Sequence, residues 1–196
     1  MLITNTLEVP QPLDAVWTFF GDIPQVAACL PGANLTNQVG ESRYEGDVVI
    51  KAGAVKLEFA GAAEIKNRDE SSRTITVDAS GADKKGRGQA SLALSAKLAP
   101  MPKGTRVDIS LDLALSGAAA QFGRGLVADV TAVLLDEFSS NMQLRLDAKS
   151  KGLDITALGA AKPASGVSIA LRAARMALAR VLRRFFLPYQ PQPTGR

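Results

Sequence analysis

The sequence contains no histidine and only one cysteine among its 196 residues. Without histidine the chain lacks the commonest general base and the commonest metal ligand, and no Ser-His or Cys-His nucleophile can be assembled. Cys29 cannot form an internal disulfide, and no activating base lies near it in the sequence, which favours a buried structural thiol. The acidic residues show no metal-ligand spacing. These absences argue against ordinary hydrolytic and metal-dependent catalysis.

A signal peptide is also absent from the N-terminal sequence MLITNTLEVP, which has neither a basic segment nor an apolar core. We therefore expect a cytoplasmic protein.

Aromatic residues make up only 5% of the chain. Seven basic residues and no acidic residue follow Asp154, so this segment carries a charge of +7. Because the net charge of the whole chain is +4, the preceding residues carry −3. Because these basic residues accompany leucines rather than base-stacking aromatics, we expect no nucleic-acid binding.

Residues 167–187 read VSIALRAARMALARVLRRFFL, with five arginines and no acidic residue. Helical spacing gathers the large apolar residues into one stripe, with arginines opposite and beside it. This pattern is typical of a helix lying on an anionic membrane surface, because arginines at the bilayer centre are costly. The residues predicted to bind the membrane are Leu171, Arg172, Arg175, Leu178, Arg180, Leu182, Arg183, Arg184, Phe185 and Phe186. A helix packed on the protein itself or on a partner subunit is the alternative.

The preceding chain predicts an α+β fold in one domain. Residues 2–9 predict a strand, two short helices follow to about residue 28, and residues 33–115 alternate with period two as six further strands separated by turns. From about residue 118 the period becomes helical, which predicts a long helix ending near Lys149 and covering the dry face of an antiparallel sheet. We therefore expect a folded domain over 1–149, a flexible Gly/Ala/Pro/Ser-rich linker over 150–166 and a basic amphipathic tail over 167–196.

The inward positions of the predicted sheet carry unusually small residues. Two explanations are open: glycines permit bends in a curved sheet that packs closely on the helix, or the small residues leave an apolar cavity between sheet and helix. In the second case Arg145, Asn141 and Tyr44 could supply polar groups to a ligand. The small inward residues are Gly46, Ala52, Gly61, Ala63, Ala79, Ala90 and Ala96.

A basic loop, GADKKGRG, contains Lys84, Lys85 and Arg87. These side chains could contact phosphate or an acidic partner, but the loop lacks the strand-to-helix context of a phosphate-binding loop. A solvated hairpin turn is the favoured interpretation.

Several segments resemble the CoxG family of carbon monoxide dehydrogenase subunits, within the START-like (SRPBCC) helix-grip superfamily. The Pro-x-x-x-Val-Trp entry is similar across the superfamily, whereas the Leu-Pro-Gly and the run from KAG to FAG are similar to CoxG proteins. The resemblance covers about residues 1–150. It is carried by VPQPLDAVWTFFGDI at 9–23, CLPGA at 29–33, YEGDVVIKAGAVKLEFAG at 44–61, GTRVDISLDLALSG at 104–117 and QFGRGLV at 121–127.

This resemblance implies a curved antiparallel sheet around a long C-terminal helix with an apolar cavity. It also implies a non-catalytic accessory protein of a molybdenum-containing (carbon monoxide) dehydrogenase, peripheral on the inner face of the cell membrane. Such a protein would carry an isoprenoid quinone, menaquinone or ubiquinone, between membrane and enzyme. A membrane tether without a ligand and an enzyme of the same fold acting on an apolar substrate are the alternatives.

Our assignment of the cavity lining comes from strand alternation and helical spacing, and its facing depends on the strand register. The predicted quinone-binding residues are Phe19, Tyr44, Val48, Phe59, Leu113, Phe122, Leu126, Val130, Leu134, Phe138 and Asn141.

Overall fold

The computed structural model describes residues 1–52 and 55–161. A first strand and two short helices are followed by six strands and a long helix, as the sequence predicts. In chain order the elements are β1 (Leu2–Val9), α1 (Leu13–Phe20), α2 (Ile23–Cys29), β2 (Ala33–Val39), β3 (Arg43–Ala52), β4 (Val55–Asp69), β5 (Thr74–Asp83), β6 (Gln89–Met101), β7 (Gly104–Leu115), the 3-10 helix η1 (Gly117–Phe122), α3 (Gly123–Ser150) and the 3-10 helix η2 (Ile155–Ala157).

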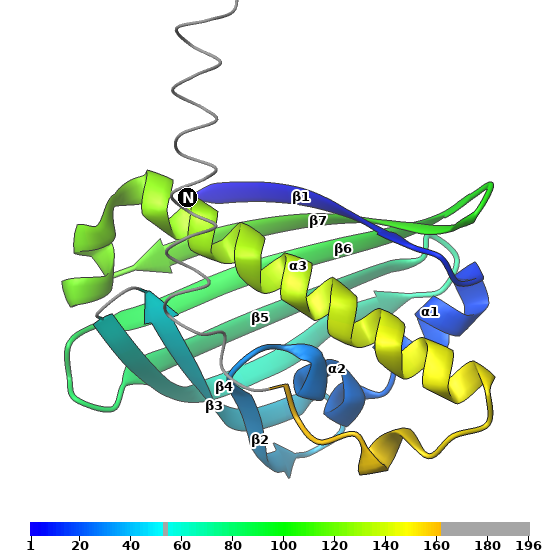
Figure 1. Ribbon diagram of the computed structural model, residues 1–196. Coiled ribbons are helices and arrows are strands. Elements are labelled where there is room, and N and C mark those ends of the chain that lie inside the picture. The colour runs from blue at the N-terminus through cyan, green and yellow to red at the C-terminus, as the bar shows by residue number, and fades with distance from the viewer. Residues whose placement is uncertain (53–54, 162–196) are drawn as a thin grey trace, which may run out of the picture.

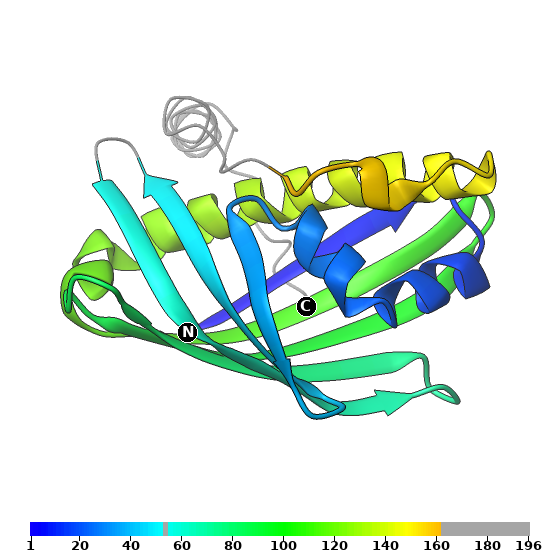
Figure 2. The same cartoon turned by 90° about the horizontal axis from the view of Figure 1, so that it is seen from below.

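The seven strands form one antiparallel sheet in the order β1-β7-β6-β5-β4-β3-β2. The sheet is bowed, and α3 runs obliquely along its concave side (Figures 1 and 2). Helices α1 and α2 lie on the same side, near the C-terminal half of α3 (Figure 1). The structure therefore confirms the expected α+β class, with a long helix covering one face of an antiparallel sheet.

The start of the long helix differs from the sequence prediction. Residues 117–122 form a 3-10 helix, and α3 begins only at Gly123. Gly117 precedes this change with a φ of +65°, and a Cβ there would lie 2.1 Å from the carbonyl oxygen of Arg87. Only glycine fits both the left-handed backbone and this close approach. The β5–β6 turn is thereby held against the segment that enters α3.

The main core lies between the sheet, α1 and the C-terminal half of α3. Val16 and Phe19 of α1 are fully enclosed there together with Met142 of α3 and Val107 of β7. A separate small cluster joins Val130 and Val133 of α3 to partly buried neighbours, Ile50 and Leu134. The buried residues on the inner side of the sheet therefore form two separate clusters rather than one continuous core.

The segment after α3 is more closely attached to the domain than the sequence predicts. The buried Arg145 donates hydrogen bonds to the carbonyls of Ile155, Leu158 and Gly159 at 3.1, 2.7 and 2.7 Å. The amide of Ala161 donates to the carbonyl of Ala28 at 2.8 Å. The described chain thus remains hydrogen-bonded to the domain as far as residue 161.

The predicted membrane tail at 167–196 lies outside the described residues. Within residues 1–52 and 55–161, no helix combines the length and the hydrophobicity that a membrane span requires.

Candidate functional site

The strand register identifies which side chains share the inner face of the sheet, because residues paired across neighbouring strands lie on the same side. Ala63 of β4 pairs with Ala79 of β5, which pairs with Leu92 of β6, and Leu92 pairs with Leu113 of β7. Four residues before Ala63 in β4, and so on the same face, Phe59 pairs with Val48 of β3. The residues predicted to point inward therefore lie on one face.

Glycine at the centre of this face is explained by the bend of the sheet. Gly46, Gly61 and Gly81 are aligned on three neighbouring strands. A Cβ at Gly61 would lie 2.0 Å from the carbonyl oxygen of Ser80, so the strands approach too closely there for a side chain. The interpretation based on sheet curvature holds for Gly61.

The alanines and larger apolar residues beside these glycines are not explained by the bend of the sheet, and their burial varies along the inner face. We define the inner apolar patch as Val48, Phe59, Ala79, Leu92 and Leu113. Each of these side chains is only half-buried. At the other end of the same face, Ala96, Leu98 and Val107 are buried completely or nearly so. The inner face is therefore buried completely at one end and only partly at the other.

The first half of α3 contributes apolar residues beside this patch. Val130 and Val133 pack with Ile50, which lies two residues from Val48 on the same face of β3. Leu134 packs against the same cluster, whereas Leu126, two turns earlier, is 37% exposed. Five of the predicted lining residues thus lie on the patch or beside it: Val48, Phe59, Leu113, Val130 and Leu134.

Other predicted lining residues lie elsewhere. Phe19 is enclosed in the main core, and Phe138 belongs to the same core, where its ring centroid is 6.3 Å from that of Phe20. Tyr44 pairs with Ala63, but its hydroxyl donates to the carbonyl of Glu41 at 3.4 Å. The side chain of Phe122 is not among those described.

The polar groups that the sequence offered to a ligand are already engaged. The side-chain amide of Asn141 donates to the carbonyl of Cys29 at 3.0 Å. Arg145 donates to Gln25 Oε1 at 2.6 Å and to three backbone carbonyls of the segment after α3. Sequence reasoning could not find these contacts, because each joins residues far apart in the chain or uses a backbone acceptor.

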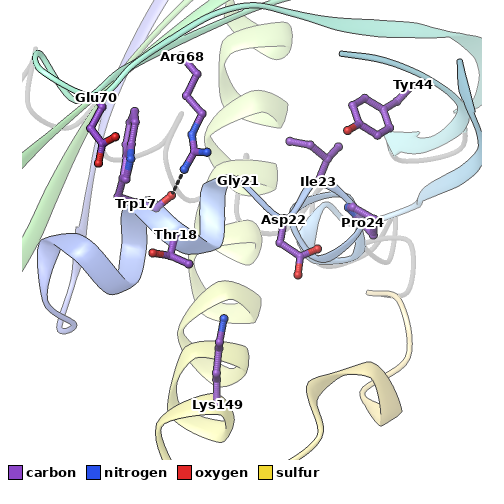
Figure 3. Close-up of a pocket in the computed structure, with 10 residues that line it drawn as sticks. All are labelled: Trp17, Thr18, Gly21, Asp22, Ile23, Pro24, Tyr44, Arg68, Glu70 and Lys149. Atoms are coloured by element: carbon purple, nitrogen blue, oxygen red, sulfur yellow. Dashed lines mark hydrogen bonds between the residues drawn. The ribbon is translucent and has the colours of Figure 1, made fainter. Parts of the chain in front are cut away.

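Two hollows in the described part of the chain are open to solvent, and neither is the enclosed apolar cavity that the sequence predicts. The first lies between α1, α2 and β4, where Arg68 donates to the carbonyl of Trp17 at 3.0 Å (Figure 3). The guanidinium of Arg68 also lies 4.6 Å from the centroid of the Trp17 ring, and that of Arg73 lies 5.2 Å from it. Each guanidinium group makes a favourable cation–π contact with the Trp17 ring.

The second hollow lies on the opposite face of the sheet. It is lined by small side chains of the outward row, such as Ala62 and Ser91, and by Arg43 and Glu45.

Two buried ionisable groups have clear structural roles. Hydrogen bonds from Arg87 hold the pKa of the Asp83 carboxyl well below its usual range. Burial raises the pKa of the Cys29 thiol to about 11, against a smaller opposite effect of Arg145. A neutral thiol is a poor nucleophile, which agrees with the structural role expected for Cys29. Among the described residues, no cluster of three histidine, cysteine or acidic side chains could hold a metal ion.

Comparison with known protein families matches residues 6–147 to the family of the carbon monoxide dehydrogenase G subunit (CoxG). No curated protein sequence shows significant similarity to this chain.

Solved structures with the same fold are numerous but distant in sequence. A conserved protein from Geobacillus kaustophilus has a TM-score of 0.68 at 21% identity and covers 76% of this chain and 97% of its own. A protein from Thermus thermophilus has a TM-score of 0.56 at 17% identity, covering 76% and 99%. An aromatase/cyclase from Streptomyces sp. R1128 has a TM-score of 0.50 at 11% identity, covering 77% and 93%. At these identities the likeness establishes the helix-grip fold and nothing about activity.

Proposed function

The chain belongs to the CoxG family of carbon monoxide dehydrogenase subunits, and from this premise we propose that it carries an isoprenoid quinone for a molybdenum-containing dehydrogenase. The quinone, menaquinone or ubiquinone, would lie between the inner apolar patch and the first half of α3. The protein would take it from the membrane and present it to the enzyme for reduction. Its role would be non-catalytic.

The partial burial of the inner apolar patch is the observation that carries this proposal. Val48, Phe59 and Leu113 are only half-buried although α3 runs along the same side of the sheet. A ligand that covered them would remove apolar surface from water, worth about 25 cal/mol per Å². An isoprenoid chain suits such a surface because it needs few polar partners.

The absence of histidine supports a carrier rather than an enzyme of the same fold. The ionisable groups nearest the patch also have structural partners. Asp83, which pairs with Phe59 across the sheet, is bound by Arg87. A bound quinone would therefore be held by apolar contacts and would undergo its redox chemistry in the company of the dehydrogenase.

The membrane part of the proposal comes from the sequence of residues 167–187. Basic residues close to an anionic leaflet contribute roughly 1 kcal/mol each, and inserted apolar side chains add to this. The same tail would serve a tether that carries no ligand. The contents of the patch, not the tail, distinguish these two functions.

The decisive experiment is native mass spectrometry with organic extraction of the full-length protein, purified without detergent from a quinone-producing host. A carrier retains a quinone or takes one up after loading, at about one molecule per chain. If the protein stays empty after deliberate loading with both menaquinone and ubiquinone, the carrier function is wrong and the tether remains.

A further inference from the structure

Three segments of the chain meet at the end of the sheet where the inner apolar patch lies. The amide of Lys84, in the β5–β6 turn, donates to the carbonyl of Glu58 in β4 at 2.8 Å. Arg87 of the same turn donates to the carbonyl of Lys56 at 2.8 Å. On the other side, the amide of Ala118 in η1 donates to the carbonyl of Arg87 at 2.6 Å. The β5–β6 turn is thus fixed between the β3–β4 hairpin and the start of α3.

This end of the molecule is basic, although the domain as a whole is not. The segments 47–60, 82–90 and 116–127 carry six basic and three acidic side chains, a net charge of +3. Residues 1–161 together carry sixteen basic and nineteen acidic side chains, a net charge of −3. We name the six basic residues the basic rim: Lys51, Lys56, Lys84, Lys85, Arg87 and Arg124.

Half of the basic rim is neutralised by the three acidic residues at this end. Lys84 Nζ lies 2.7 Å from Asp47 Oδ2, Arg87 Nε lies 2.8 Å from Asp83 Oδ2, and Lys56 pairs with Glu58. Within the described part of the chain, no ion pair is found for Lys51, Lys85 or Arg124. Lys85 and Arg124 are exposed. The charges of Lys85 and Arg124 are therefore available to an external anionic surface.

The basic rim also borders the inner apolar patch directly. Val48 pairs with Phe59, and Phe59 pairs with Asp83, the last residue of β5 before the basic turn. The rim therefore begins where the patch ends. Lys51 and Lys56 pair with each other across β3 and β4 and lie on the outer face at this end, opposite the row of Val48 and Phe59.

From this arrangement we infer that the basic rim docks on anionic lipid headgroups, so that the inner apolar patch opens toward the bilayer. Anionic phospholipids attract exposed lysine and arginine side chains, and the attraction acts within about 8 Å at physiological ionic strength. Docking at this end spares an apolar molecule a passage through water. The inference rests on the proposed function for its cargo, but the docking itself does not depend on which cargo is carried.

The first test places an environment-sensitive fluorophore on the basic rim of the full-length protein through Lys85→Cys. The matched control is Lys103→Cys in the β6–β7 turn, at the opposite end of the sheet. Cys29 is completely buried, so the label is restricted to the introduced thiol. With vesicles containing phosphatidylglycerol we expect a blue shift and a brighter signal at position 85, no change at position 103, and neither effect with phosphatidylcholine alone.

The second test reverses the unpaired charges in the full chain. The double variant Lys85→Glu/Arg124→Glu should bind phosphatidylglycerol vesicles at least about tenfold more weakly than the unchanged protein. The control Lys97→Glu/Lys103→Glu makes the same change in net charge at exposed positions away from the rim and should bind nearly as the unchanged protein does. Equal weakening in both double variants would mean that only net charge matters, and would overturn the inference.

A label at position 85 that stays silent on vesicles that do bind the protein would also overturn it. A response only to the partner dehydrogenase would assign the rim to an acidic protein surface instead. The quinone proposal can fail independently of this inference. In that case native mass spectrometry would find the protein empty, while the label at position 85 would still respond to lipid.

Discussion

Arg87 binds both carboxylate oxygens of Asp83, with Nε and Nη2 each 2.8 Å from an oxygen. The amides of Glu58 and Lys85 donate to the same carboxylate at 3.1 Å. Asp83 is 4% exposed and is paired across the strands with Phe59 of the inner apolar patch. This bidentate pair therefore organises the basic turn at the border of the inner apolar patch.

The Asp83–Arg87 pair predicts a specific pH dependence. Because the folded-state pKa of Asp83 lies well below its usual range, its contribution to stability is present above a pH of about 4 and is lost as the pH falls through the folded-state pKa. Asp83→Asn should lower the thermal midpoint at pH 7, and the difference from the unchanged protein should shrink only below about pH 4. Calorimetry from pH 7 to pH 3 tests this. A difference that already disappears at pH 5 would contradict it.

The hydrogen bonds of Arg145 predict that this residue stabilises the segment after α3. Arg145→Met keeps the length of the side chain but removes every donor to Ile155, Leu158 and Gly159. We expect a loss of about 3 kcal/mol in the free energy of unfolding, because hydrogen bonds from a charged group contribute roughly 1.5 to 3 kcal/mol each. Hydrogen exchange at the amide of Ala161 should accelerate. The exposed Lys149→Met, one turn along the same helix, is the control and should change neither quantity.

Cys29 predicts an unreactive thiol in the native protein. Its side chain is completely buried, and its pKa is raised to about 11. A thiol-reactive dye at pH 8 should label the protein only after denaturation. Because the unfolded thiol loses its proton at lower pH than the folded one, stability should also decline as the pH rises from about 9 toward 11. A serine at this position should remove that part of the decline.

Ala79→Trp tests whether the space above the inner apolar patch is free. If the space is free, we expect the free energy of unfolding to change by less than about 1 kcal/mol while quinone uptake is lost, because overpacking a filled core would cost roughly 1 to 3 kcal/mol. The control is Ala93→Trp, an exposed alanine on the outer face of the neighbouring strand β6. Quinone uptake by Ala79→Trp at the level of the unchanged protein would place the ligand elsewhere.

Deletion of residues 167–196 tests the predicted tail. We expect the remaining chain to stay folded, because the hydrogen bonds of Arg145 and Ala161 lie before the deletion. It should sediment much less with vesicles containing phosphatidylglycerol, and added salt should weaken the binding of the full chain. Sedimentation equal to that of the full chain would show that the tail is not needed for membrane binding.

The fold followed from the sequence because its signals are local and repeated. Alternation such as that of Val107, Ile109 and Leu111 against Asp108 and Ser110 identifies both a strand and its buried side. Glycine- and proline-containing turns separate the strands, and the change to helical spacing marks α3. The lack of histidine, which narrows the possible catalytic chemistry, can also be read from the sequence without a structure.

The site was predicted less completely, because alternation reports which way a side chain points but not how far away the opposite layer lies. Val48, Phe59 and Leu113 were placed correctly on the inner face by alternation alone. Phe19 and Phe138 point inward too, yet they belong to the closed core, where α1 and α3 approach each other. No property of their sequence neighbourhood distinguishes the two cases.

The sequence by itself therefore determined the α+β class, the inner face of the sheet and the basic, apolar composition of the tail, because periodicity and composition are properties of neighbouring residues. Only the tertiary structure decided that Arg145 holds the segment up to residue 161, that Asn141 binds the carbonyl of Cys29, and that the basic turn borders the inner apolar patch. These are contacts between distant segments, and they depend on how the layers pack in three dimensions.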